Sequence, residues 1–185
     1  SIDPVTEITL AEDAVLEIGP GSGTLPARLA AHARRVLALE LDRALLPVLH
    51  DALADCGNVT LAQGDATRAD LRALAAQAFG EGSSFLVVAN LPYYVTTPVL
   101  TRLLTEGLPV TRIAVMVQRE VGEKLTAQPG DAAYCLLSVL CAWHAQAREA
   151  LAVPAAAFTP RPKVDSSFMV LDMRAQPPVP QADAD

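Results

Sequence analysis

The sequence predicts an α/β fold, in which a mostly parallel sheet of seven strands has helices on both faces and ends in a late antiparallel hairpin. Short runs rich in Val, Leu and Ala alternate with longer segments of helical period, which is the pattern of strand–helix–strand units. A glycine-rich turn directly follows the first apolar run. The last two apolar runs are separated only by a proline-rich loop, residues 154–162, and this arrangement indicates a hairpin.

Each expected strand of the parallel part is followed by a segment of helical period. We place the strands at residues 14–18, 36–40, 59–62, 85–89 and 113–118. We place the helices at residues 24–33, 43–55, 69–78, 98–106 and 132–141. The hairpin strands are expected at residues 146–153 and 167–173.

The composition fits one globular domain. Its 185 residues are 51% hydrophobic and only 4% aromatic, enough for a real core. We expect residues 1–174 to form this domain and the Pro-, Ala- and Asp-rich residues 175–185 to be a tail or linker. No apolar run reaches transmembrane length and no signal segment leads the chain, so we expect a cytoplasmic protein with no membrane partner. The three scattered cysteines favour buried thiols over a metal site or disulfides.

A glycine turn, residues 19–23, runs from the first strand into a helix and is preceded by Glu17. Glycines at alternate positions permit unusual dihedral angles and let a ligand touch the backbone, as Gly19 and Gly21 would here. The pattern is G-x-G-x-G, and the turn contains no Lys or Arg to hold a diphosphate. By itself, such a turn is also compatible with a purely structural role.

Two acids follow the next two strands. Glu40 ends the second strand, where a carboxylate can accept both hydroxyls of a ribose, and Asp65 follows the third, where it could accept an adenine amine. Either acid alone is more typical of a surface charge or a helix cap. Features at three consecutive strand ends, which meet at one edge of a parallel sheet, favour a nucleoside ligand. Without a diphosphate-binding residue, S-adenosylmethionine fits better than NAD.

The fourth strand ends in the Asn-Leu-Pro-Tyr motif, residues 90–93. An aromatic amine is a poor nucleophile, and two acceptors, the Asn90 amide oxygen and the Leu91 carbonyl, can direct its lone pair at a sulfonium methyl. The following proline fixes φ and removes a competing donor. Tyr93 offers a ring on which an extruded base can stack. A mere strand-end turn is the competing interpretation.

These motifs together resemble those of the ribosomal RNA adenine dimethyltransferases. The resemblance extends from Val15 to Leu171 and includes two downstream segments, residues 116–121 and the Phe-Thr-Pro-Arg-Pro-Lys-Val-Asp-Ser run at 158–166. It is closest to the KsgA type, which modifies two adjacent adenines near the 3′ end of small-subunit ribosomal RNA. The resemblance implies a Rossmann-like fold, S-adenosylmethionine as cofactor, no metal, and immature small-subunit RNA as the partner of a monomeric enzyme.

The resemblance also assigns roles to individual residues. Gly19 and Gly21 would approach the methionine part of the cofactor, Glu40 the ribose and Asp65 the adenine. The cofactor-binding set is completed by Glu17, Ala66 and Asn90. In the target site, Asn90 and Leu91 would position the amine while Tyr93 and Phe158 contact the base; Phe158 could equally be a core aromatic. The candidate phosphate contacts, for which a solvated surface role is equally open, are Arg119, Lys124, Arg161 and Lys163.

The chain departs from the family at both ends. The family's basic N-terminal segment with a Gln-Asn-Phe motif has no counterpart before Val15, and its small helical C-terminal domain has none after Leu171. The net charge of −7 argues against a general nucleic-acid binder. We therefore expect the full-length chain to be less negative, with a positive face beside Tyr93.

Four alternatives remain open. A macrolide-resistance-type methyltransferase of 23S ribosomal RNA would share the chemistry, but more often has Ile where this chain has Leu91. A DNA adenine methyltransferase would more often have Pro there. A small-molecule methyltransferase would have no need for residues 90–93. From a different class, the protein could be a ribosome-assembly factor whose binding matters more than its turnover.

Overall fold

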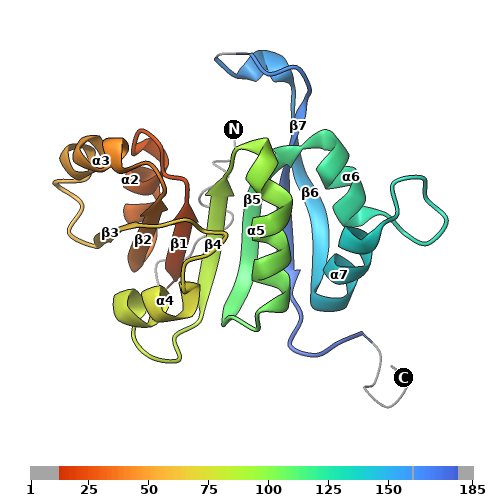
Figure 1. The fold of residues 1–185 in the computed structure, drawn as a ribbon, viewed down its shortest axis with the longest axis horizontal. Helices are drawn as coiled ribbons and strands as arrows, with labels where there is room; N and C mark the ends of the chain where they lie inside the picture. Colours follow the sequence, from red (N-terminus) through yellow and green to blue (C-terminus); the bar gives the residue numbers. More distant parts are fainter. Residues whose placement is uncertain (1–12, 160, 179–185) are drawn as a thin grey trace. The chain divides into compact units, whose positions relative to one another are not determined.

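The computed structural model of the chain describes residues 13–159 and 161–178. Seven strands in this part form one mixed sheet in the order β3-β2-β1-β4-β5-β7-β6, as drawn in Figure 1. The prediction of a mostly parallel sheet ending in an antiparallel hairpin is therefore confirmed. The chain divides into two compact units, unit 1 (residues 1–90 with 108–110) and unit 2 (residues 91–107 with 111–185).

Unit 1 contains four parallel strands. They are β1 (Ala14–Ile18), β2 (Arg35–Glu40), β3 (Val59–Gln63) and β4 (Phe85–Asn90). Strand β1 pairs with β2 on one side and with β4 on the other, and β2 pairs with β3. All five residues of β1 are buried, as expected for a central parallel strand covered on both faces. The parallel pairing brings the carboxyl ends of all four strands to one edge.

Short helices connect these strands. They are α2 (Thr24–Ala30), the 3-10 turn η1 (Arg43–Leu45), α3 (Leu46–Ala52) and α4 (Leu71–Phe79). Two of them begin with aspartate caps: Asp42 accepts the Ala44 N–H at 2.8 Å, and Asp70 accepts the Ala73 N–H at 2.9 Å. The single helix expected at residues 43–55 is thus split, because the Asp42 cap starts a 3-10 turn before the α-helix.

Unit 2 contains the antiparallel part of the sheet. Strand β7 (Ser166–Met173) lies between β5 (Val110–Gln118) and β6 (Ala145–Val153) and is antiparallel to both. A short 3-10 turn, η2 (Ala155–Ala157), interrupts the proline-rich loop between β6 and β7. The helices α6 (Arg119–Thr126) and α7 (Leu136–His144) pack on each other and on β6 (Figure 1).

The helix positions in unit 2 differ from the prediction. Helix α5 spans Tyr93–Thr105 and starts five residues before the predicted Pro98, which lies inside the helix. Proline favours the first helical turn, so the sequence pointed to Pro98, but Pro92 caps the helix instead. Helix α6 was not predicted. Its eight residues are mostly polar, and the segment is shorter than the roughly 11 to 18 residues over which an apolar period is normally recognised.

The cysteine prediction is partly confirmed. All three cysteines are free, but only Cys141 is buried, and the other two are partly exposed. Within the described residues, no helix has the length and apolar character needed to cross a membrane.

Candidate active site

The edge formed by the carboxyl ends of β1–β4 carries most of the predicted cofactor residues. The glycine turn follows β1, Glu40 is the last residue of β2, Asp65 lies two residues beyond β3, and Asn90 is the last residue of β4. All of them belong to unit 1. Because the four strands are parallel, these residues share one edge, which is where open α/β sheets bind ligands.

The glycine turn has three residues with positive φ. The angles are 77° at Gly19, 56° at Gly21 and 88° at Gly23, which only glycine adopts without strain. The Gly19 N–H donates to the Leu39 carbonyl at 3.0 Å and so fixes the turn to β2. A Cβ atom added at Gly21 would meet no heavy atom within 4 Å. Gly21 is therefore needed for its backbone conformation, and the space beside it is open.

Glu40 is buried and holds the glycine turn. One carboxylate oxygen accepts the Gly21 N–H at 3.3 Å and the other accepts the Asp42 N–H at 2.8 Å. A carboxylate has about four acceptor positions, so it can accept two ribose hydroxyls in addition to these two donors. The structure thus adds a role in shaping the turn to the role expected for Glu40.

Glu17, in β1, is the most unusual acid at this edge. It is only 1% exposed, and its Oε2 atom is buried with no hydrogen-bond partner in the described residues. Burial raises the pKa of Glu17 to about 8, and the negative charge of Glu40 adds to the rise. The sequence showed Glu17 only as the acid before the turn. Its burial depends on the flanking strands.

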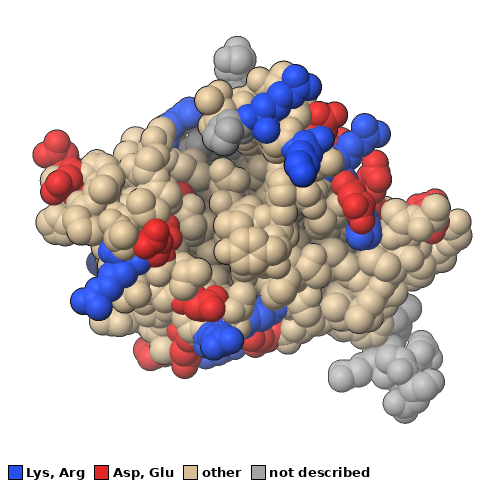
Figure 2. All heavy atoms as spheres, turned by 45° about the horizontal axis from the view of Figure 1, so that its top comes forward, with Lys and Arg blue, Asp and Glu red and all other residues tan. Residues whose placement is uncertain are grey.

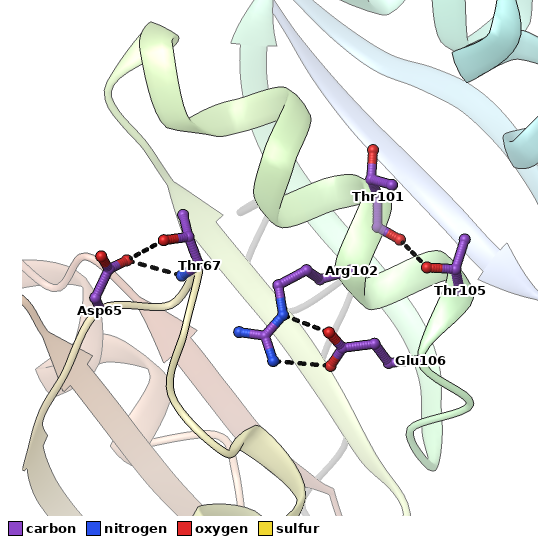
Figure 3. Close-up of polar contacts among 6 residues, drawn as sticks. All are labelled: Asp65, Thr67, Thr101, Arg102, Thr105 and Glu106. Atoms are coloured by element: carbon purple, nitrogen blue, oxygen red, sulfur yellow. Dashed lines mark hydrogen bonds and ion pairs between the residues drawn. The ribbon is translucent and has the colours of Figure 1, made fainter.

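Asp65 is held in a local turn, shown in Figure 3. One carboxylate oxygen of Asp65 accepts both the backbone N–H of Thr67 at 2.8 Å and its hydroxyl at 2.6 Å. The backbone carbonyl of Asp65 accepts the N–H groups of Arg68 and Ala69. A local capping role, the alternative that the sequence left open, is therefore present. The neighbouring Ala66 is buried.

The Asn-Leu-Pro-Tyr motif includes the point along the chain where unit 1 ends and unit 2 begins. Asn90 is exposed at the end of β4, and Leu91 is buried at the start of unit 2. Pro92 has φ −54° and ψ 140° and caps helix α5, and its carbonyl accepts the Thr96 hydroxyl at 3.2 Å. The proline therefore ends the strand and starts the helix within one residue.

Two tyrosines begin helix α5. Tyr93 is 40% exposed, and its hydroxyl lies 3.4 Å from the Ser166 hydroxyl of β7. The next residue, Tyr94, is 78% exposed and was not singled out from the sequence. The signal that could have drawn attention to it was the repeated tyrosine in a chain with few aromatics. Both rings are accessible for stacking.

The proline-rich loop holds Phe158 and is tied to the start of helix α6. Asp165 accepts the Ala155 N–H through its side chain at 2.8 Å and the Arg119 N–H through its carbonyl at 3.0 Å. Phe158 directly follows η2 and is half-buried. This exposure is compatible with either a base contact or a packing role. Pro160, in the same loop, lies outside the described residues.

Three of the four predicted phosphate contacts line one surface hollow in unit 2. It has a volume of about 450 Å³, and its charged lining consists of Arg119, Arg161 and Lys163 with Glu120, Glu123 and Asp165. The fourth cation, Lys124, does not line the hollow among the described residues and bonds Glu120 instead. Basic and acidic side chains are interspersed on the face drawn in Figure 2. The described part of the chain has no group of three or more potential metal ligands.

The fold and the edge of unit 1 define the class of protein. The chain is similar in structure to a 23S rRNA methyltransferase, ErmE, with a TM-score of 0.81 and 27% identity. The match covers 96% of this chain and 70% of that one. A dimethyladenosine transferase from Plasmodium falciparum has a TM-score of 0.78 and 24% identity, covering 92% of this chain and 60% of that one. The chain therefore has the Rossmann-like fold of S-adenosylmethionine-dependent methyltransferases.

The family follows from the sequence comparison. The family described as "Ribosomal RNA adenine dimethylase" matches residues 4–185, and the chain belongs to it. "Ribosomal RNA small subunit methyltransferase A" of Oceanobacillus iheyensis is 43% identical over 174 residues, which are 94% of this chain and 59% of that relative. The same protein of Bacillus thuringiensis is 44% identical over 93% of this chain and 59% of its own length. The chain thus spans 59% of the length of these relatives, and the resemblance inferred from its motifs is confirmed.

Proposed function

We propose that the protein transfers methyl groups from S-adenosylmethionine to the N6 amines of two adjacent adenines near the 3′ end of small-subunit (16S) ribosomal RNA. The products would be dimethyladenosines made during ribosome biogenesis. The observation that carries the proposal is the position of Asn90, at the same edge of unit 1 as the glycine turn and Glu40. Membership of the adenine dimethylase family and relatives named for the small subunit support it.

The cofactor would be held by unit 1. The buried unpaired oxygen of Glu17 and the open space beside Gly21 fit a ligand at this edge. The backbone at Gly19 and Gly21 would contact the methionine part, while Glu40 accepts the ribose hydroxyls. Asp65 and Ala66 would contact the adenine. The bound cofactor would supply an electrophilic methyl group and would become S-adenosylhomocysteine when its bond to that methyl breaks.

The target amine would be positioned by the Asn-Leu-Pro-Tyr motif. The side-chain oxygen of Asn90 and the carbonyl of Leu91 accept its two N–H groups, which directs the nitrogen lone pair toward the methyl. Tyr93 stacks on the base, and Phe158 contacts its other face. Such positioning would supply most of the rate acceleration. No strong base is needed, because the methylated ammonium loses its proton readily.

RNA phosphates would bind at the hollow of unit 2. Arg119, Arg161 and Lys163 line it, although the acids in the same lining reduce its positive potential. Lys124 and Arg119 are weaker candidates than Arg161 and Lys163, because Lys124 bonds Glu120 and Arg119 bonds Glu123 at 3.1 Å. We also propose that residues 1–174 carry the catalytic activity and that residues 175–185 act as a linker; residues 179–185 lie outside the described residues.

A second candidate is methylation of 23S ribosomal RNA, favoured by the structural match to ErmE at 27% identity. The relatives named for the small subunit are 43–44% identical, which favours the first candidate. The chain has Leu91 where the macrolide-resistance type more often has isoleucine, and this difference also favours the small-subunit candidate.

Labelled S-adenosylmethionine tests the proposal. The full chain is incubated in parallel with immature small ribosomal subunits, large subunits and duplex DNA, and label is counted in each nucleic acid. We expect label in small-subunit RNA only, and none with Asn90→Ala. The exposed-loop variant Glu81→Gln serves as a control that should retain activity. Label confined to large-subunit RNA or to DNA would overturn the substrate assignment.

A further inference from the structure

Glu17 is a buried acid whose surroundings disfavour a negative charge. Its carboxyl is 1% exposed, and Oε2 has no hydrogen-bond partner in the described residues. The acidic side chain of Glu40 repels a negative charge on the Glu17 carboxyl. A buried carboxylate without a partner or a positive neighbour is strongly disfavoured relative to the neutral acid.

The surroundings of β1 offer Glu17 little positive charge. The paired strand β2 carries Arg35 and Glu40, and the other paired strand, β4, carries no titratable residue. Arg35 pairs in register with Ala14 at the opposite end of β1, and its guanidinium donates to the Ala78 carbonyl at 2.9 Å. Helix α2, after the glycine turn, carries only Arg28, in its last turn. Among the described residues, the charge that acts on Glu17 is thus the negative one on Glu40.

A cationic ligand at the glycine turn would favour the ionised form of Glu17 over the neutral acid. The turn follows Glu17 by two residues, and the position of a Cβ atom at Gly21 is open. The methionine part of S-adenosylmethionine carries a sulfonium and an ammonium group. A positive charge within a few ångströms of a carboxyl in a medium of low dielectric constant favours the ionised form by a large factor.

We propose that Glu17 is the cation-recognising group of the cofactor site, protonated while the site is empty and ionised when S-adenosylmethionine binds, so that cofactor binding releases one proton to solvent. This inference rests on the proposed function for the identity of the cofactor. The carboxyl O–H bond breaks, its electron pair stays on Glu17, and the proton goes to buffer. No oxidant or further reactant is needed.

The proposal has two measurable consequences. At pH 7 a carboxyl with a pKa of about 8 is mostly protonated, so binding should release close to one proton. Between pH 5.5 and 7, where the charges of the cofactor stay constant, the affinity should rise roughly tenfold per pH unit. Cofactor binding therefore becomes weaker in acid, although the cofactor itself does not change charge in that range.

Isothermal titration calorimetry of the full chain with S-adenosylmethionine tests this at pH 7. The binding enthalpy is measured in phosphate and in Tris, and its dependence on the ionisation enthalpy of the buffer gives the number of protons released. We expect a value close to one for the wild type and for Glu81→Gln, and close to zero for Glu17→Gln. The affinity of Glu17→Gln should be lower than that of the wild type at pH 7 and nearly independent of pH.

Tight binding by the wild type without proton release would overturn the inference, whether or not Glu17→Gln folds. Proton release that persists in a folded Glu17→Gln variant would also overturn it, because another group would be its source. Neither result would affect the proposed methylation of RNA. Conversely, label appearing only in large-subunit RNA would overturn the proposed substrate while leaving the proton linkage intact.

Discussion

The cofactor edge of unit 1 and the charged hollow of unit 2 place their acids in opposite surroundings. The Oε2 atom of Glu17 is buried and has no hydrogen-bond partner among the described residues, whereas Glu120, which lines the hollow, is exposed and bonds Lys124. Burial raises the pKa of Glu17, while the hydrogen bond and the charge of Lys124 lower the pKa of Glu120. Exposed ion pairs contribute little to stability because water screens them. Changes at the cofactor edge should therefore have large effects, and changes at the hollow small, salt-dependent ones.

The largest effect is expected for Asn90→Ala at the cofactor edge. Loss of its amide oxygen removes one of two acceptors for the target amine, and we expect kcat to fall by roughly 10²-fold or more. Single-turnover methylation of small-subunit RNA measures this. Binding of the ribosomal subunit should change much less. A variant that methylates at the wild-type rate would remove Asn90 from the catalytic motif.

Glu17→Gln should stabilise the empty protein at alkaline pH. The folded-state pKa of Glu17, about 8, lies above its ordinary value of 4.5, so the native state binds the extra proton. The wild type therefore loses stability as pH rises from about 4.5 to 8, by an amount on the order of a few kcal/mol. Urea unfolding at pH 5 and pH 8.5 measures the difference. The stabilisation by Gln should appear only at the higher pH, and equal effects at both values would contradict it.

Gly21→Ala tests whether the glycine turn needs its left-handed backbone. At φ 56° an alanine is strained by about 1 kcal/mol even though its Cβ meets open space. Thermal unfolding should show this loss, and cofactor affinity should fall with it. Gly57→Ala is the matched control, since its Cβ also meets nothing within 4 Å but its φ is not positive. Equal stability of the two variants would contradict a conformational requirement at Gly21.

Lys163→Ala and Lys124→Ala compare a cation of the hollow with one already bonded to an acid. Removing a phosphate contact lowers RNA affinity severalfold and reduces the slope of affinity against salt by about one. We expect this for Lys163, which lines the hollow, and a smaller change for Lys124. Filter binding at several salt concentrations measures both slopes. A larger loss of RNA affinity for Lys124→Ala than for Lys163→Ala would show that RNA does not bind at the hollow.

The smallest effect is expected for Glu120→Gln. In its ion pair with Lys124, the Glu120 side chain is 72% exposed and the Lys124 side chain 35% exposed. Water screens such a pair, so the free energy of unfolding should stay the same within error. Urea unfolding at neutral pH checks this. A clear destabilisation would mean that charges beside the hollow are coupled as strongly as those at the cofactor edge.

The two regions also differ in how far the sequence predicted them. The parallel strands of unit 1 are short and mostly apolar, so their ends, and hence the shared edge of Glu40 and Asn90, could be predicted from the sequence. In unit 2, the start of α5 was predicted wrongly at Pro98, and α6 was missed because the helix is short and mostly polar. The hollow depends on the loop joining α6 through Asp165, a tertiary contact that no local pattern reveals. For the same reason, the sequence did not predict that Glu17 is buried and that its Oε2 atom has no partner in the described residues, because both features depend on the neighbouring strands.

We propose that this chain dimethylates two adjacent adenines of small-subunit RNA through Asn90. Mass spectrometry of nuclease fragments from treated immature small subunits tests this proposal most directly. We expect two neighbouring N6-dimethyladenosines near the 3′ end with the wild type and neither with Asn90→Ala. Unmodified adenines there after treatment with a wild-type chain that binds cofactor and subunit, or dimethylation that survives Asn90→Ala, would contradict it.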